Sequence, residues 1–172
     1  MLAAIQVCQI LGISENAIRN GVKTFKGVKR RFEFVAETST KVYIDDYAHH
    51  PTEIEAFVRS LKALYPGKKI KLIFQPHLFT RTRDFAEGFA QSLSLADEVV
   101  LLDIYPAREK PLPGITSEII LKNITSSQKS LQTKAEVLLN LQSGNDYEVL
   151  ATVGAGDIDT LVKPIKDIVE KL

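Results

Sequence analysis

The spacing of apolar residues changes once along this chain, and the change separates two kinds of predicted element. Residues 1–30 carry apolar positions at helical spacing, with Gly12 ending the first apolar run and Ser14 in the position of a helix cap. From Arg31 onward, short apolar runs typical of strands alternate with helical patterns. Alternation of this kind over short connections predicts a mainly parallel sheet with helices on both faces.

The predicted elements can be placed along the chain, although their order in the sheet cannot. We expect strands at residues 31–38, 41–46, 70–74, 98–104, 130–132 and 147–153. We expect helices at residues 51–64, 83–95, 117–123, 135–141 and from 158 to the end. A short turn separates the first two strands, which can therefore pair as an antiparallel hairpin. The predicted fold is a Rossmann-like α/β domain of about six strands.

Polar motifs follow four of the predicted strands. These loops are residues 45–51, 75–84, 105–110 and 154–157. In an open parallel sheet, ligands bind beyond the carboxyl ends of the strands, so the four loops should meet at one edge. All three histidines of the chain, His49, His50 and His77, lie in the first two loops. This grouping favours a functional cleft over loop residues that are only solvated.

Single motifs leave more than one interpretation open. Gly154-Ala155-Gly156, between a strand and a helix, suits a phosphate, but a tight turn explains it equally well. Arg81 and Arg83 at the head of a helix suit a carboxylate, the alternative being a solvated helix start. Asp45 and Asp46, close to two histidines, suit a metal ion.

Composition narrows the classes of function. Lys and Arg number 22 against 21 Asp and Glu, so the basic field that nucleic acid or an anionic membrane requires is not expected. The single cysteine, Cys8, excludes a disulfide framework and a cysteine-based zinc site, and it fits a reducing cytoplasm. The chain has no G-x-x-x-x-G-K-[ST] phosphate loop. It therefore presents a cleft without a complete catalytic apparatus.

Several motifs resemble those of the Mur ligase family. Residues 46–51, Asp-Tyr-Ala-His-His-Pro, resemble the D-Y-A-H-x-P motif that opens the C-terminal domain of these enzymes. Residues 27–33 resemble the arginine-bearing linker into that domain. Residues 74–84 and 102–107, with Pro113-Gly114, resemble the alanine-adding branch of the family. The tripeptide-recycling branch, kept as an alternative, shares the first motif but not F-Q-P-H…T-R-T-R-D.

The resemblance implies a three-domain bacterial enzyme of peptidoglycan precursor synthesis. We expect residues 1–28 to be a helical stub resembling the end of the central ATPase domain and residues 29–172 to be the C-terminal domain. The implied partners are the N-terminal and central domains of the same chain, without nucleic acid or membrane, in the cytoplasm. This fragment alone is expected to be inactive, and the segment from Lys26 to Arg30 is expected to be a hinge.

The resemblance also implies the chemistry. ATP with Mg²⁺, both needing the central domain, would phosphorylate the lactyl carboxylate of UDP-N-acetylmuramate, and the amine of L-alanine would attack the resulting acyl phosphate. Arg31 would meet the ATP phosphates and Asp46 the ribose. No residue of this chain is assigned to a metal.

The remaining loops would form the amino-acid site. The implied substrate-binding residues are Tyr47, His49, His77, Arg81, Arg83 and Tyr105. The residues expected to take part in the reaction are His49, His50 and Arg81. Arg81 and Arg83 would bind the alanine carboxylate, with His77 holding their loop. Arg108 stands where a small residue is expected in this branch, so a surface role is an open alternative.

Two interpretations from other classes stay open. A two-metal phosphoesterase would use Asp45 and Asp46 with the neighbouring histidines, and metal analysis of the purified protein would identify it. A stand-alone flavodoxin-like module would bind a nucleotide or amino acid without turnover. Tight ligand binding by this chain would identify that second class.

Overall fold

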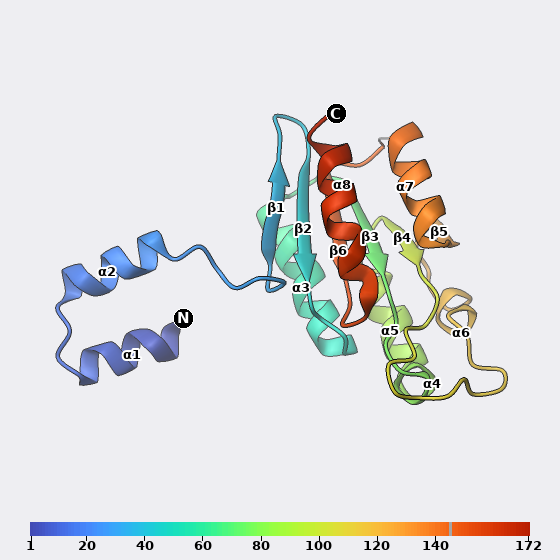
Figure 1. Ribbon diagram of the computed structural model, residues 1–172, viewed down its shortest axis with the longest axis horizontal. Helices are drawn as coiled ribbons and strands as arrows, with labels where there is room; N and C mark the ends of the chain where they lie inside the picture. Colours follow the sequence, from blue (N-terminus) through green and yellow to red (C-terminus); the bar gives the residue numbers. More distant parts are fainter. Residues whose placement is uncertain (145) are drawn as a thin grey trace.

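The computed structural model describes residues 1–144 and 146–172. Figure 1 shows a helix pair near the N-terminus that an extended linker connects to an α/β body. Within the described residues, the body holds a six-stranded sheet. Its strands are β1 (Glu33–Glu37), β2 (Val42–Asp46), β3 (Ile70–Phe74), β4 (Glu98–Leu101), β5 (Gln128–Leu131) and β6 (Val149–Val153).

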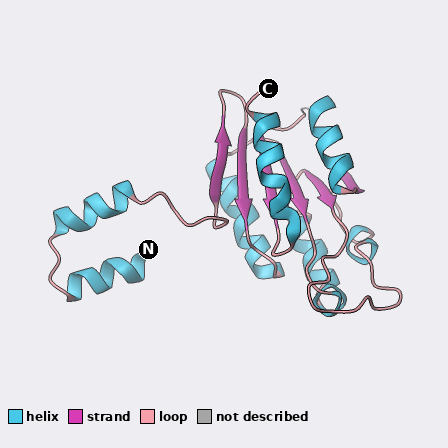
Figure 2. Cartoon of the chain, in the orientation of Figure 1, coloured by secondary structure: helices cyan, strands magenta, loops and turns pink. Residues whose placement is uncertain are grey.

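The sheet is mainly parallel, as the sequence predicts. Its strand order is β1-β2-β6-β3-β4-β5. β1 and β2 form the expected antiparallel hairpin, and the other neighbouring pairs are parallel (Figure 2). The last strand therefore lies in the middle, between β2 and β3. All five residues of β3 and of β6 are buried, which explains why both read as continuous apolar runs.

Helices cover both faces of the sheet (Figure 1). The helices on one face are α3 (Pro51–Leu64), α5 (Ala86–Leu93) and α6 (Glu118–Leu121). The other face carries α7 (Lys134–Ser143), the 3-10 turn η1 (Asp157–Leu161) and α8 (Val162–Val169). Phe57 and Phe89 pack in the first of the two resulting cores, and Leu141 and Ile165 pack in the second.

The predicted helix at 83–95 is wrong in its bounds. It consists of α4 (Phe79–Asp84) and α5, which meet at Phe85. Phe85 leaves helical geometry, with φ −118° and ψ 17°, and its ring packs against His50 at 4.7 Å between ring centroids. A tertiary contact therefore coincides with the break, and helical periodicity alone cannot reveal such a contact.

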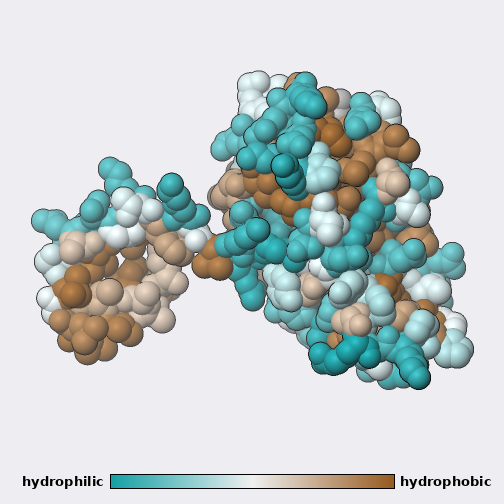
Figure 3. Space-filling model, in the orientation of Figure 1, coloured by the Kyte–Doolittle hydropathy of each residue, from teal (hydrophilic) through white to brown (hydrophobic). Residues whose placement is uncertain are grey.

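The helix pair consists of α1 (Leu2–Ile10) and α2 (Glu15–Thr24). Ser14 caps α2 as predicted, accepting a hydrogen bond from Ala17 N–H at 3.4 Å. Neither helix contains a buried residue. Leu2 and Ile10 are 85% and 75% exposed, and Figure 3 shows apolar surface gathered over this part of the molecule.

Candidate functional site

The four polar loops meet at one end of the body. In Figure 1 the arrowheads of β2, β3 and β4 point to the same end, where α4 lies, and β6 runs parallel to β2 and β3. Backbone hydrogen bonds join the loops in pairs: Gly154 N–H donates to Asp46 O at 3.1 Å, and Leu78 N–H donates to Tyr105 O at 3.0 Å. The expectation that these loops converge is confirmed, because parallel strands end on the same edge.

Four rings from three loops form a row along this edge, called here the ring row: Tyr47, His49, His77 and Tyr105. Tyr47 and His49 lie 5.5 Å apart between ring centroids, and His49 and His77 lie 6.5 Å apart. His77 stacks on Tyr105 at 5.8 Å, with 22° between the ring planes. Residues predicted from three separate motifs therefore lie side by side.

The hydrogen bonds of His49 define which ring nitrogen carries its proton. Nδ1 lies 3.0 Å from the carbonyl oxygen of Tyr47, which can only accept, so Nδ1 is the donor. Nε2 of a neutral His49 is therefore unprotonated. Behind the ring, Glu53 accepts hydrogen bonds from the N–H groups of His49 and His50 at 2.9 and 3.2 Å. Burial raises the pKa of Glu53, but these hydrogen bonds, together with the charges of His49 and Arg31, lower it below its ordinary value.

His50 turns away from the ring row. Its Nδ1 lies 3.0 Å from the Thr52 hydroxyl, and its ring packs edge-on against Phe85. The two adjacent histidines thus have different surroundings, and His49 is the one that faces His77. The part assigned to His50 in the reaction stays a prediction.

His77 and Arg81 form a pair inside this edge. Arg81 Nη1 donates to His77 Nδ1 at 3.3 Å, since a guanidinium has no acceptor. Partial burial and then the Arg81 charge lower the pKa of His77, with His49 and Arg108 acting in the same direction. His77 is therefore neutral at neutral pH, and the guanidinium of Arg81 keeps its charge for an anion.

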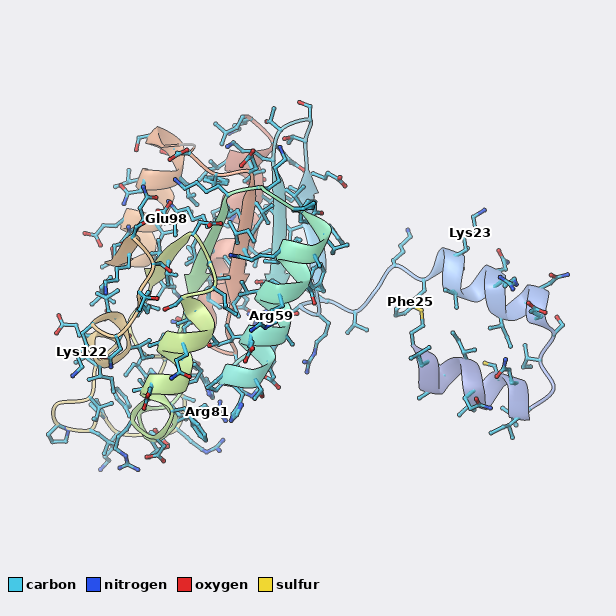
Figure 4. The ribbon with its side chains drawn as sticks, turned by 180° about the vertical axis from the view of Figure 1, so that it is seen from behind. Lys23, Phe25, Arg59, Arg81, Glu98 and Lys122 are labelled. Atoms are coloured by element: carbon cyan, nitrogen blue, oxygen red, sulfur yellow. The ribbon has the colours of Figure 1, made fainter. Side chains whose placement is uncertain are left out.

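The two candidate arginines of α4 do not point the same way. Residues two apart on a helix do not face each other. Arg81 turns to His77, at the lower end of the body in Figure 4, whereas Arg83 pairs with its neighbour Asp84 at 2.7 Å on the exposed surface. Arg81 therefore lies beside the ring row, in contact with His77. The carboxylate-binding role of Arg83 stays a prediction, and Arg108 is exposed.

Asp46 connects the linker to the start of the histidine loop. Its Oδ2 accepts from Phe32 N–H at 2.7 Å and its Oδ1 accepts from Ala48 N–H at 2.8 Å. Each carboxylate oxygen has two acceptor positions, and Asp46 is only partly buried, so it retains capacity for a hydroxyl. The exposed guanidinium of Arg31 lies 5.7 Å from the Tyr47 ring centroid. The contacts predicted for these two residues with the ribose and phosphates of a nucleotide stay predictions.

Arg30, which the sequence indicates only as a linker residue, is the centre of a buried network. Its Nε donates to Asp45 at 3.0 Å and its Nη2 donates to Gly154 O at 2.6 Å. Asp45 is fully buried and also accepts from the Thr152 hydroxyl at 2.6 Å. Because the Thr152 hydroxyl uses its only hydrogen for this bond, Tyr43 is the donor in its 2.9 Å contact with Thr152. Burial raises the pKa of Asp45, while Thr152 and Arg30 oppose the rise.

The contacts of Arg30 bear on two expectations, the hinge in the linker and the metal site at the aspartates. Residues 28–31 form a turn that Arg30 holds against the sheet. The hinge expected from Lys26 to Arg30 stays a prediction, and its last residue is fixed by these contacts. Asp45 pairs with Arg30 and Asp46 binds backbone amides, so the ligand set of a two-metal phosphoesterase is otherwise engaged. Across residues 1–144 and 146–172, no group of three or more His, Cys, Asp or Glu could hold a metal.

The glycines at the end of β6 serve close packing. A Cβ on Gly154, whose φ is +144°, would lie 2.7 Å from Gln75 O, and one on Gly156 would lie 2.4 Å from Gln75 Oε1. Gln75 fills this space and binds the start of η1, accepting from Ile158 N–H at 2.8 Å. The turn interpretation therefore accounts for both glycines.

No helix among the described residues is long and apolar enough to cross a bilayer.

Comparison with known proteins shows which proteins the chain resembles. The ligase of Cytophaga hutchinsonii named UDP-N-acetylmuramate–L-alanine ligase is 48% identical over 98% of this chain, and that of Parabacteroides distasonis is 51% identical over 99%. The crystal structure of UDP-N-acetylmuramate-alanine ligase from Thermotoga maritima matches 99% of the chain, with a TM-score of 0.75 and 30% identity.

These matches cover only part of each known protein. The chain spans 36% and 37% of the two curated relatives and 36% of the Thermotoga maritima chain. The family model described as Mur ligase, glutamate ligase domain, matches residues 30–161, which include Arg30 and Arg31 of the linker turn, the ring row and both glycines. The chain therefore belongs to the Mur ligase, glutamate ligase domain family.

Proposed function

We propose that this chain supplies one wall of the active site of an ATP-dependent ligase that joins L-alanine to UDP-N-acetylmuramate. The observation that carries the proposal is the convergence of Arg81 with the ring row at the carboxyl ends of β2, β3 and β4. The names of the relatives, at 48% and 51% identity, support the choice of substrates.

His49 is the group that we assign to proton transfer. The ammonium of an amino acid must lose a proton before its nitrogen can attack an activated carboxyl group. The Nδ1–H of His49 donates to Tyr47 O, so Nε2 carries the lone pair and is oriented by the backbone. Its partly buried position at the open edge allows contact with substrate.

Arg81 is the group that we assign to the carboxylate of L-alanine. A guanidinium binds a carboxylate through parallel hydrogen bonds, and Arg81 has no described ion pair that would compete. His77 limits the positions of Arg81 by accepting a hydrogen bond from it. Tyr105, stacked on His77, closes the wall beside the side chain of the bound amino acid.

Asp46 and Arg31 are assigned to the nucleotide side of the wall. Bound ATP would supply the phosphoryl group that activates the lactyl carboxylate, and Mg²⁺ would neutralise the phosphates. Asp46 would accept a hydrogen bond from the ribose, and Arg31 would contact the phosphates. Because Asp46 also binds Phe32 N–H, nucleotide contact and linker position are coupled.

A hybrid enzyme tests the proposal. This chain replaces the segment that it matches in the Cytophaga hutchinsonii ligase, and phosphate release is measured with UDP-N-acetylmuramate, MgATP and each of several amino acids. We expect L-alanine to give the highest kcat/KM and the isolated chain to give no turnover. A hybrid that folds but prefers another amino acid, or releases no phosphate, contradicts the proposal.

Variants of the hybrid test the residue roles. His49→Asn should lower kcat roughly 100-fold, the usual scale for losing a general base. Arg81→Met should raise KM for L-alanine roughly tenfold or more, with KM for ATP unchanged. Arg59→Met, on the exposed side of α3 where Arg59 pairs with Glu55, is the matched control and should leave both constants unchanged.

A further inference from the structure

The loop that follows β4 is fastened at two places, to the segment just before α4 and to α4 itself. The first is backbone pairing at its start: Tyr105 N–H donates to Pro76 O at 2.8 Å, and Tyr105 O accepts from Leu78 N–H at 3.0 Å. After Tyr105 the chain turns sharply, with Ala107 at φ 50° and Glu109 N–H donating to Pro106 O at 2.9 Å. This turn brings Glu109 to α4.

The second fastening is the carboxylate of Glu109. Its Oε2 accepts from Thr80 N–H at 3.0 Å and its Oε1 accepts from the Thr80 hydroxyl at 2.5 Å. These hydrogen bonds lower the pKa of Glu109, so the group is ionised at neutral pH. Both oxygens are thus engaged with one residue, which is 29 positions away in the sequence.

Thr80 immediately precedes Arg81, so the contact of Glu109 with Thr80 affects the position of the loop relative to Arg81. Arg81 contacts His77, His77 stacks on Tyr105, and Tyr105 begins the loop that ends at Glu109. The contact of Glu109 with Thr80 connects the far end of this loop back to the residue beside Arg81. Because the carboxylate of Glu109 binds Thr80, it does not pair with Arg81. The guanidinium of Arg81 therefore stays available for the carboxylate of the substrate.

We propose that Glu109 is a positioning residue that sets the size of the amino-acid site by holding Tyr105 at a fixed distance from Arg81. The inference rests on the proposed function, in which Arg81 binds the substrate carboxylate and Tyr105 closes the wall beside its side chain. Glu109 does not touch the substrate. It selects a small side chain by preventing the loop from moving outward.

The structural half of the test uses the ligand-free 172-residue chain. Amide hydrogen exchange, read by NMR, should become at least about tenfold faster at Thr80 in Glu109→Ala, since a hydrogen bond to a charged acceptor is lost. Glu118→Ala removes an exposed carboxylate further along the same connection and is the matched control. Unchanged exchange at Thr80 in Glu109→Ala overturns the inference.

The kinetic half uses the active hybrid. Glu109→Ala and Thr80→Val, which break the contact from opposite sides, should each raise KM for L-alanine about tenfold and lower its kcat/KM advantage over L-serine by a similar factor, the usual scale for one small group. KM for ATP should stay constant. Thr80→Ser keeps the hydroxyl and should retain both values.

The outcomes separate two failures. If the unmodified hybrid adds no L-alanine, the proposed function fails and the role of Glu109 falls with it. If the hybrid adds L-alanine but Glu109→Ala and Thr80→Val keep its KM and its selectivity, Glu109 has no positioning role. A double variant no worse than either single variant supports one shared contact, and additive losses contradict it.

Discussion

At the scale of residues, the two histidines of the ring row have opposite tautomers. His49 donates from Nδ1 to Tyr47 O, whereas His77 accepts at Nδ1 from Arg81. In the neutral rings, Nε2 of His49 is therefore an acceptor and Nε2 of His77 a donor. The sequence predicts that both residues lie at one edge, but their partners, and hence their protons, follow from contacts between loops.

The first prediction concerns the pH dependence of stability. The folded-state pKa of His77 lies below the ordinary 6.5, so the unfolded chain binds a proton first as the pH falls. Stability should therefore decrease as the pH falls from 6.5 towards the folded pKa of His77. Urea unfolding at about pH 7.5 and about pH 5.5 should show a smaller loss for His77→Gln than for the wild type. Equal losses would contradict the expectation.

The second prediction concerns Gly154. A Cβ there meets Gln75 O at 2.7 Å in a backbone conformation that disfavours side chains, so Gly154→Ala should lower the free energy of unfolding by about 2 kcal/mol. Gly21→Ala is the control, because its Cβ enters open space within a helix and should not destabilise. Chemical denaturation measures both. A neutral Gly154→Ala would show that the turn shifts without cost.

At the scale of elements, the turn at residues 28–31 is the least predictable part of the site. The sequence shows three consecutive basic residues there, which as a pattern favours an exposed linker. The structure instead assigns Arg30 to Asp45 and leaves Arg31 exposed. A fully buried Asp45 needs a cation or several donors, and that requirement becomes visible only when its burial is known.

The third prediction tests that turn. Arg30→Met leaves Asp45 buried without its cation and should lower the free energy of unfolding by roughly 3 kcal/mol. Lys29→Met, on the exposed side of the same turn, should change it by less than about 0.5 kcal/mol. Adding Asp45→Asn to Arg30→Met should recover part of the loss, because the unpaired charge is removed. A double variant that is less stable than Arg30→Met would contradict the pairing.

At the scale of the whole molecule, the packing separates the helix pair from the body. Both cores consist of residues from Phe32 onward, within the part of the chain that the structure describes. We propose that the boundary between the two units lies near residue 28, next to Gly27 with its φ of +86°. The α/β body then owes its stability to its own two cores.

The fourth prediction follows from this separation. Removing residues 1–24 should change the melting temperature of the body by less than about 2 °C, because no core residue is lost. It should also reduce the binding of a hydrophobic dye, since exposed apolar side chains such as Leu2 and Ile10 are removed. Calorimetry and dye fluorescence measure the two effects. A large fall in melting temperature would show that the helices support the body.

The sequence by itself determined the α/β class and the four loops at one edge, because apolar periodicity is a local property and strands joined through helices run parallel. It allowed the hairpin at β1 and β2 through their short connection. The tertiary structure alone decided which residues contact each other across the site. Arg30 with Asp45, Gly154 with Gln75, and Glu109 with Thr80 join residues 15, 79 and 29 positions apart. Gly154 meets Gln75 because β6 lies beside β3, and Glu109 meets Thr80 because β4 lies on the other side of β3. Arg30 pairs with Asp45 because Asp45 is fully buried. Strand order and burial exist only once the chain has folded.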